Sequence, residues 1–222
     1  PGANNLFDVT HFDFDHCLAK WLHLGYLLLL EKLDHPDAEF GTYAGRVLRM
    51  AKSAGLATSV DLVTAESDAY QRVVVPVLPQ VDYFIINEIE AERTTGIKTR
   101  SDGSLLKEGV EAAATQLFAL GVNRGVVIHF SEGGFAARKD GSKFWQGALA
   151  LPPDKIRNTT GAGDAFCSGF LYGCYHDWPV QKCLEMAVCC AAGNIGVAAS
   201  SGGMAIKEAN FTLLQKYACR AI

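Results

Sequence analysis

The residues that could do chemistry gather in one short stretch, Asn158 to Phe166, with the sequence NTTGAGDAF. Gly161 and Gly163 have no side chains, so a ligand can approach the backbone closely there. Small and apolar residues continue after Asp164 at helical spacing, which predicts a turn that opens onto a buried helix. The first amides of a helix have no partner inside it, and together with the helix dipole they favour an anion such as phosphate.

Asp164 would stand in the first turn of that helix, beside the anion site. A carboxylate repels a bound phosphate, so its role there would be chemical: it could accept the proton of a hydroxyl that attacks the phosphate. The alternative is an ordinary helix N-terminus, because Thr and Gly are turn residues and Asp is favoured in a first helical turn. Spacing alone leaves both interpretations open.

The whole stretch resembles the C-terminal signature of the ribokinase-like, or PfkB, carbohydrate kinases, which is Asp-Thr-x-Gly-Ala-Gly-Asp followed by a hydrophobic helix. The resemblance implies that Asp164 is the catalytic base and that the amides of Gly161, Ala162 and Gly163 form the anion hole. In the family the first Asp, here Asn158, helps to bind a monovalent cation, usually K⁺. Asn keeps a carbonyl oxygen but lacks the charge, which predicts a weak response to K⁺, with the Asn158 amide bonding the loop instead.

A second motif, Asn87 to Ala91, follows an apolar run at residues 83–86 and begins a predicted helix. Asn87 could cap that helix, and Glu88 and Glu90 could complement its dipole. Asn-x-x-Glu with the following Thr-Gly-Ile also resembles a motif of the same kinases, in which the Asn and Glu organise Mg²⁺ and the phosphates largely through water. Mg²⁺ keeps several waters and takes few protein ligands, so such a sparse site is chemically sensible.

The resemblance also implies nucleotide contacts. Where the family has Thr-Leu-Gly-x-x-Gly, this chain keeps Gly134 but has His129 for Thr and Ser131 for Gly. Ser131 could still donate a hydrogen bond to a phosphate, whereas His129 suits a structural role and a nucleotide contact equally. In the family a later helix and loop wall the adenine, which makes Gly203 the first candidate there and Asn194 a weaker one that could instead serve helix packing.

Alternating apolar segments predict the elements that position these residues. Apolar runs predict strands at 20–30, 83–86 and 125–130, the first buried on both faces with His23 as a core histidine. A further short strand is predicted at 58–61, where it ends in Asp61. Helical spacing predicts helices at 42–54, 106–120, 183–198 and near the C-terminus. The alternation predicts an α/β fold, a mostly parallel sheet with helices on both faces, and the resemblance implies a single ribokinase-like three-layer domain over residues 1–222.

Composition excludes several classes of protein. The net charge is −4, so there is no basic surface for nucleic acid. The longest apolar run, residues 24–30, is too short to span a bilayer, so no membrane partner is expected. The seven cysteines lack Cys-x-x-Cys spacing, which predicts reduced core thiols in a cytoplasmic protein rather than zinc ligands.

The resemblance as a whole implies an ATP-dependent kinase that uses Mg²⁺ and phosphorylates a hydroxyl of a sugar or sugar-like small molecule. A nucleoside kinase on the same fold is one alternative. A non-catalytic nucleotide- or metabolite-binding relative is another, favoured by Asn158, His129 and Ser131 but not by Asp164. In the family a Gly-Ala-Asn segment like residues 2–4 lies well inside the chain, so we expect the N-terminal strands and the lid, through which a homodimer would form, to be missing.

Overall fold

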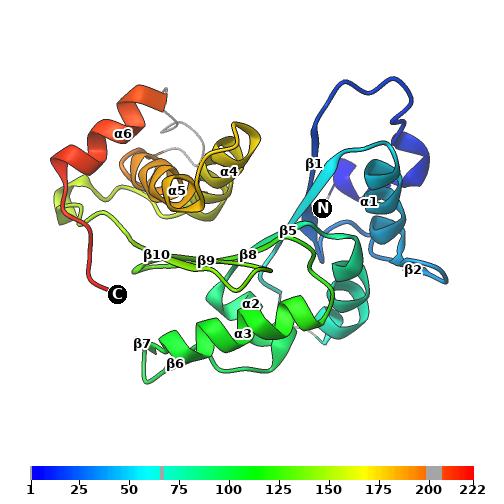
Figure 1. The fold of residues 1–222 in the computed structure, drawn as a ribbon, viewed down its shortest axis with the longest axis horizontal. Helices are drawn as coiled ribbons and strands as arrows, with labels where there is room; N and C mark the ends of the chain where they lie inside the picture. The colour runs from blue at the N-terminus through cyan, green and yellow to red at the C-terminus, as the bar shows by residue number, and fades with distance from the viewer. Residues whose placement is uncertain (1, 66–67, 199–206) are drawn as a thin grey trace. The chain divides into compact units, whose positions relative to one another are not determined.

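The computed structural model describes residues 2–65, 68–198 and 207–222, with side chains from residue 210 in the last range (Figure 1). The chain divides into two compact units. Unit 1 comprises Pro1–Val127 and Ala137–Gly141, and unit 2 comprises Ile128–Ala136 and Ser142–Ile222. The expectation of a single domain stays a prediction.

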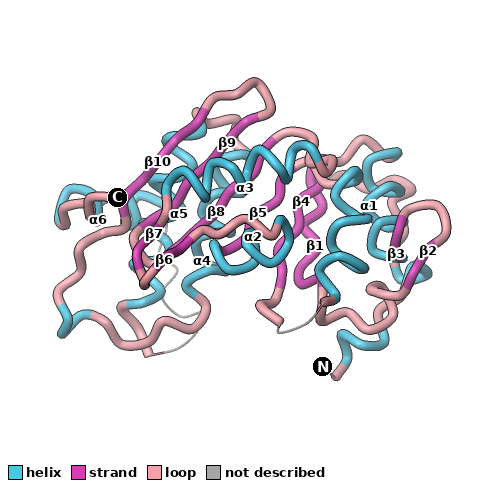
Figure 2. Tube along the Cα trace, turned by 90° about the horizontal axis from the view of Figure 1, so that it is seen from below, coloured by secondary structure: helices cyan, strands magenta, loops and turns pink. Residues whose placement is uncertain are grey.

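The main sheet has six strands in the order β1-β4-β5-β8-β9-β10. β1 pairs with β4 in parallel, and β4 pairs with β5 in parallel, with Val60 opposite both Leu24 and Phe84. Figure 2 shows β1 and β4 side by side. The sheet confirms the predicted α/β class. Its strands are β1 (Trp21–Leu27), β4 (Ala57–Leu62), β5 (Tyr83–Asn87), β8 (Gly125–Phe130), β9 (Gly133–Arg138) and β10 (Lys143–Gly147).

Local capping interactions and glycine conformation set where two helices of unit 1 begin and end. The Thr42 hydroxyl accepts a hydrogen bond from the Gly45 amide at 3.3 Å and caps α1. Gly96, in the left-handed region at φ 75°, ends α2. Unit 1 also contains several short helical turns and two-residue strands. They are η1 (Ala3–Leu6), η2 (Val9–His11), β2 (Pro36–Asp37), β3 (Gly41–Thr42), η3 (Tyr70–Val74), η4 (Val75–Gln80), β6 (Arg100–Ser101) and β7 (Ser104–Leu105). The helices are α1 (Tyr43–Ser53), α2 (Glu88–Thr95) and α3 (Lys107–Ala119).

β1 corrects one prediction. Leu24 and Leu27 are buried, but His23 and Gly25 are exposed, so this strand is not buried on both faces and His23 is not a core histidine. Alternate residues of a strand point to opposite faces, and within unit 1 α1 packs against β1 and β4. The continuous apolar run misled because its last leucines, residues 28–30, lie beyond the end of the strand.

Unit 2 contains η5 (Pro153–Lys155), α4 (Ala162–Tyr175), α5 (Val180–Ile195) and α6 (Lys207–Lys216). α4 and α5 pack closely because glycines of α4 face α5: a Cβ atom added to Gly169 would lie 2.9 Å from Cα of Ala187. α5 ends before the predicted residue 198, since Gly193 and Gly196 are poor helix formers. The predicted loop at 200–203 lies outside the described residues.

The described cysteines are all free thiols, and Cys167, Cys183, Cys189 and Cys190 are buried, as predicted for core thiols. Within the described ranges, none of the helices has both the length and the apolar character needed to cross a membrane.

Candidate active site

The predicted anion turn forms the N-terminus of α4. Gly161 is the N-terminal cap residue, with φ 80° in the left-handed region that favours glycine. No side chain of the described residues caps this end of the helix, so Asp164 is in the first turn without acting as a cap. The side chain of Asp164 is exposed. A molecule that binds at this turn would therefore meet both the backbone amides and the carboxylate of Asp164.

Two side-chain amides hold the turn in place by bonding the Thr160 backbone. Asn158 Oδ1 accepts a hydrogen bond from the Thr160 amide at 3.0 Å, and Asn158 Nδ2 donates to the carbonyl of Ala198 at 3.3 Å. Asn194, in the last turn of α5, donates from Nδ2 to the Thr160 carbonyl at 3.0 Å. Asn158 thus bonds the loop through its amide, as predicted, and an Asp there could not donate to Ala198.

Asn194 also offers an oxygen that could be a ligand of the predicted monovalent cation. Its side chain is buried, and its Oδ1 atom has no hydrogen-bond partner among the described residues. Such an oxygen could accept a water or a weakly held cation. An amide oxygen carries no net charge, so Asn194 by itself would hold K⁺ only weakly.

His129 packs directly beneath the turn. A Cβ atom added to Gly163 would lie 3.0 Å from Cε1 and 3.4 Å from Nε2 of the imidazole, so a larger residue here would require the ring to move by a few tenths of an ångström. The ring also packs against Phe166, with centroids 5.2 Å apart. Desolvation lowers the pKa of His129 to about 4, against the opposing charge of Asp164. The imidazole is therefore neutral near pH 7 and supports the turn without adding positive charge.

The predicted nucleotide contacts have local explanations in unit 2. Ser131 lies in the turn between β8 and β9, and its Oγ donates to Glu132 Oε2 at 2.8 Å. Gly134 is buried, and a Cβ atom there would lie 2.6 Å from Cζ of Phe166, so packing alone requires glycine. Gly203 lies outside the described residues. The nucleotide contacts stay predictions.

Asn87 and Glu90, in unit 1, form the capping arrangement that the sequence left as an alternative. Asn87 Oδ1 accepts from the Glu90 amide at 2.8 Å, and Glu90 Oε2 accepts from the Asn87 amide at 2.9 Å. Thr64 joins them: its hydroxyl donates to Glu90 Oε1 at 2.7 Å and accepts from Asn87 Nδ2 at 2.9 Å. Both carboxylate oxygens of Glu90 are therefore engaged.

The burial and hydrogen bonds of Glu90 show how well this side chain could serve as a ligand of Mg²⁺. Glu90 is 3% exposed, and burial raises its pKa to about 7, with Asp61 and Glu88 adding negative charge. Mg²⁺ binds oxygens at about 2.0–2.1 Å, and each Glu90 oxygen already accepts a hydrogen bond within a buried side chain. This arrangement therefore favours a contact through water over direct ligation by Glu90.

Sequence reasoning missed a polar cluster in unit 1. His23 Nδ1 lies 2.8 Å from Ser59 Oγ, and His23 Nε2 lies 3.6 Å from Asp61 Oδ2. Asp61 comes near the C-terminal end of β4, and ligands of open α/β sheets bind beyond the carboxyl ends of strands. The acid at that strand end is visible in the sequence, but the partner on β1 could be found only once the parallel register was known.

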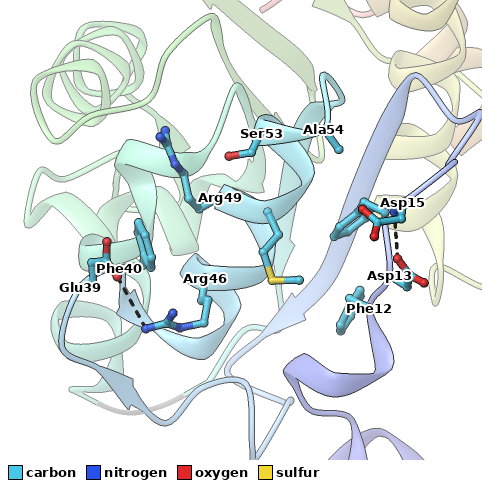
Figure 3. A pocket seen from close by; sticks show the side chains of 11 residues that line it. Phe12, Asp13, Asp15, Glu39, Phe40, Arg46, Arg49, Ser53 and Ala54 are labelled. Atoms are coloured by element: carbon cyan, nitrogen blue, oxygen red, sulfur yellow. Dashed lines mark hydrogen bonds and ion pairs between the residues drawn. The ribbon is translucent and has the colours of Figure 1, made fainter.

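A cavity of about 700 Å³ lies elsewhere in unit 1, between the segment 12–15 and α1 (Figure 3). Arg46 on its wall is held by Asp37 at 2.6 Å and by Glu39 at 3.8 Å. Acidic, basic and aromatic side chains line it together, and none of the predicted site residues does. Cavity volume therefore does not identify the site here.

The fold is that of an α/β protein, and a glycine-containing turn without a side-chain cap forms the N-terminus of α4. The family described as pfkB family carbohydrate kinase matches residues 1–205, and the chain belongs to that family.

Three curated relatives share part of the sequence. A 5-dehydro-2-deoxygluconokinase of Geobacillus kaustophilus (strain HTA426) is 33% identical over 82 residues, which are 37% of this chain and 24% of that protein. Ribokinase of Schizosaccharomyces pombe is 29% identical over 135 residues, 59% of this chain and 41% of the relative. Adenosine kinase 1 of Arabidopsis thaliana is 26% identical over 118 residues, 53% of this chain and 34% of the relative. The chain thus spans less than half the length of these relatives.

Solved structures show the same fold. The Arabidopsis thaliana ribokinase complexed with ribose and ATP has a TM-score of 0.66 and 23% identity, over 77% of this chain and 51% of that chain. Ribokinase II from E. coli in complex with ATP and Mg²⁺ has a TM-score of 0.70 and 16% identity, over 93% of this chain and 62% of that chain. At these identities the likeness establishes the ribokinase-like fold.

Proposed function

We propose that this chain carries the phosphoryl-transfer site of an ATP-dependent kinase that phosphorylates a hydroxyl of a sugar or sugar-like small molecule. The observation that carries the proposal is the N-terminus of α4, where Gly161 in the left-handed region leaves the helix without a side-chain cap and Asp164 is exposed in the first turn. Family membership and the kinases among the relatives support the same reaction.

In this proposal each residue of the turn has a separate role. Asp164 accepts the proton of the attacking hydroxyl. The amides of Gly161, Ala162 and Gly163 stabilise charge on the transferring phosphoryl group. Asn158 and Asn194 fix the Thr160 backbone, so the amides keep their direction before substrate binds. Neutral His129 packs under Gly163 and supports the turn without adding positive charge beside Asp164.

The cofactors are proposed from the family. ATP and Mg²⁺ are bound in solved relatives, and Mg²⁺ when bound neutralises phosphate charge. Asn87 and Glu90 would contact it only through water, and Ser131, Gly134, Asn194 and Gly203 remain the proposed nucleotide contacts. K⁺ would have little effect because of Asn158. A cytoplasmic location and a homodimer formed through a lid are part of the same proposal.

The decisive experiment is Asp164→Asn in the full-length protein. Losing a general base costs about 10²- to 10⁴-fold in rate, so we expect kcat to fall by that factor while ATP affinity and melting temperature stay close to wild type. The matched control is Asp154→Asn, which changes an exposed carboxylate of the same unit and should leave kcat unchanged. An Asp164→Asn enzyme that folds and keeps full kcat would contradict the assignment.

A second candidate, a nucleoside kinase on the same fold, is favoured by the match to adenosine kinase 1. ATP turnover measured across a panel of sugars and nucleosides separates the two. Turnover with no acceptor, together with retained ATP binding, would instead favour a non-catalytic relative.

A further inference from the structure

Two thiols meet where α4 ends and α5 begins. Cys174 is in the last turn of α4 and Cys183 is in the first turn of α5, and Figure 1 shows the two helices alongside each other. The helix backbones are very close here: a Cβ atom added to Gly173 would lie 2.7 Å from Sγ and 3.1 Å from Cα of Cys183. The Cys183 thiol also donates to the Trp178 carbonyl at 3.6 Å. The neighbouring Cys174 therefore lies within reach of Cys183.

The two sulfurs are hydrogen-bonded to each other, and this bond is the main reason why the pKa of Cys183 is lowered. The positive charge of Lys182 acts in the same direction. Elsewhere on α5 burial has the opposite effect, raising the pKa of Cys189 to about 12 and that of Cys190 to about 11. Since the thiolate is the reactive form of cysteine, reactivity on α5 is concentrated at Cys183.

The pair also divides the two tasks of a redox site. Cys174 is partly exposed, so a small oxidant can reach its sulfur, whereas Cys183 is buried. The sulfurs are already in hydrogen-bond contact, and side-chain rotation could close them to a disulfide bond of about 2.0 Å. Only residues 176–179 connect α4 to α5, so the disulfide would join the two helices beside the loop that links them.

We propose that Cys174 and Cys183 form a redox-sensitive pair that a peroxide oxidises to a disulfide joining α4 to α5. Cys183, as the thiolate, takes the thiol proton of Cys174 through their hydrogen bond, and the Cys174 sulfur attacks one oxygen of hydrogen peroxide; the O–O bond breaks, hydroxide leaves, and a sulfenic acid forms. Cys183 then attacks that sulfur, the S–O bond breaks, and the sulfenic hydroxyl leaves as water. The net reaction converts two thiols and one peroxide into one disulfide and two waters, and the thiols supply both electrons.

The test treats the full-length protein with hydrogen peroxide, blocks remaining thiols with iodoacetamide, and maps the peptides by mass spectrometry. We expect a Cys174–Cys183 cross-link that lacks two hydrogen atoms and disappears on reduction with dithiothreitol. Cys189 and Cys190 should still be alkylated after denaturation. Exposed Cys17 is the internal reference for unassisted oxidation.

Two variants complete the test. Cys174→Ser, at a partly exposed position, should abolish the cross-link, and Cys183→Ser should leave Cys174 as a sulfenic acid that dimedone traps. Cys174 consumed no faster than Cys17, a sulfinic acid at Cys174 without a cross-link, or a disulfide between other cysteines would each overturn the proposal. Because no measurement depends on turnover, the result is independent of the proposed kinase activity.

Discussion

Gly169→Ala is the sharpest test of the contact between α4 and α5. Gly169 is buried, and an added Cβ atom would lie 2.9 Å from Cα of Ala187, from Sγ of Cys190 and from the carbonyl oxygen of Met186. Real Cβ atoms do not approach other atoms this closely, and two of the three neighbours are backbone atoms that cannot rotate away. The substitution therefore forces α4 and α5 apart.

Two effects of opposite sign set the magnitude. Overpacking a core typically costs about 1–3 kcal/mol, whereas Ala in place of Gly inside a helix stabilises by about 1 kcal/mol. Because the clash is with backbone, we expect the upper part of the first range and a net loss of about 1–2 kcal/mol. For a chain of this size that lowers the melting temperature by about 2–8 °C.

The assay is thermal unfolding of Gly169→Ala beside Ser168→Ala. Ser168 is exposed on the same helix, so its substitution keeps the gain in helix propensity without the clash. We expect Ser168→Ala to leave the melting temperature unchanged or slightly raised. If Gly169→Ala also raised it, the helices would have room for a methyl group and the packing argument would be refuted.

Three further predictions follow from the site. Unfolded histidine protonates near pH 6.5 but His129 only near pH 4, so the unfolded state binds more protons between these values and the free energy of unfolding falls as the pH drops. Between pH 7 and pH 5, His129→Gln should therefore lose about 2 kcal/mol less of its unfolding free energy than wild type, as measured by urea unfolding. Glu90→Gln should keep the capping box, since Gln also suits this position. The substitution should therefore alter the Mg²⁺ dependence of turnover more than the melting temperature. An unchanged Mg²⁺ titration together with a lower melting temperature would leave capping as the only role of Glu90. Asn158→Asp should gain activation of turnover by K⁺ relative to a large inert cation. A tenfold activation of wild-type turnover by K⁺, about 1.4 kcal/mol, would contradict the role given to Asn158.

Sequence patterns predicted the elements whose signals are local. β5 and α3 were found nearly to the residue, because β5 is a short apolar run next to Asn87 and α3 has an apolar face that ends before Gly121. The turn that opens α4 was predicted for the same reason, since its glycines and the helical spacing both lie within a few residues of Asp164. These features depend little on what packs around them.

The failures depended on distant partners. The exposure of His23 follows from which face of β1 is covered, and its contact with Asp61 follows from the register of β1 with β4. Asn87 and Glu90 suited both a cap and a metal site, and only Thr64, more than 20 residues away, showed that both Glu90 oxygens are engaged. Residue types alone could not make these distinctions.

The two amides that hold Thr160 also have a consequence for entropy. Fixing the backbone of one residue costs about 1–2 kcal/mol of conformational entropy, and a glycine-rich turn has more freedom to lose than most. Here Asn158 restrains the Thr160 amide and Asn194 restrains its carbonyl, from two separate parts of unit 2. The turn is therefore ordered when the chain folds, and an anion bound there, as proposed, would not have to supply the free energy that orders it.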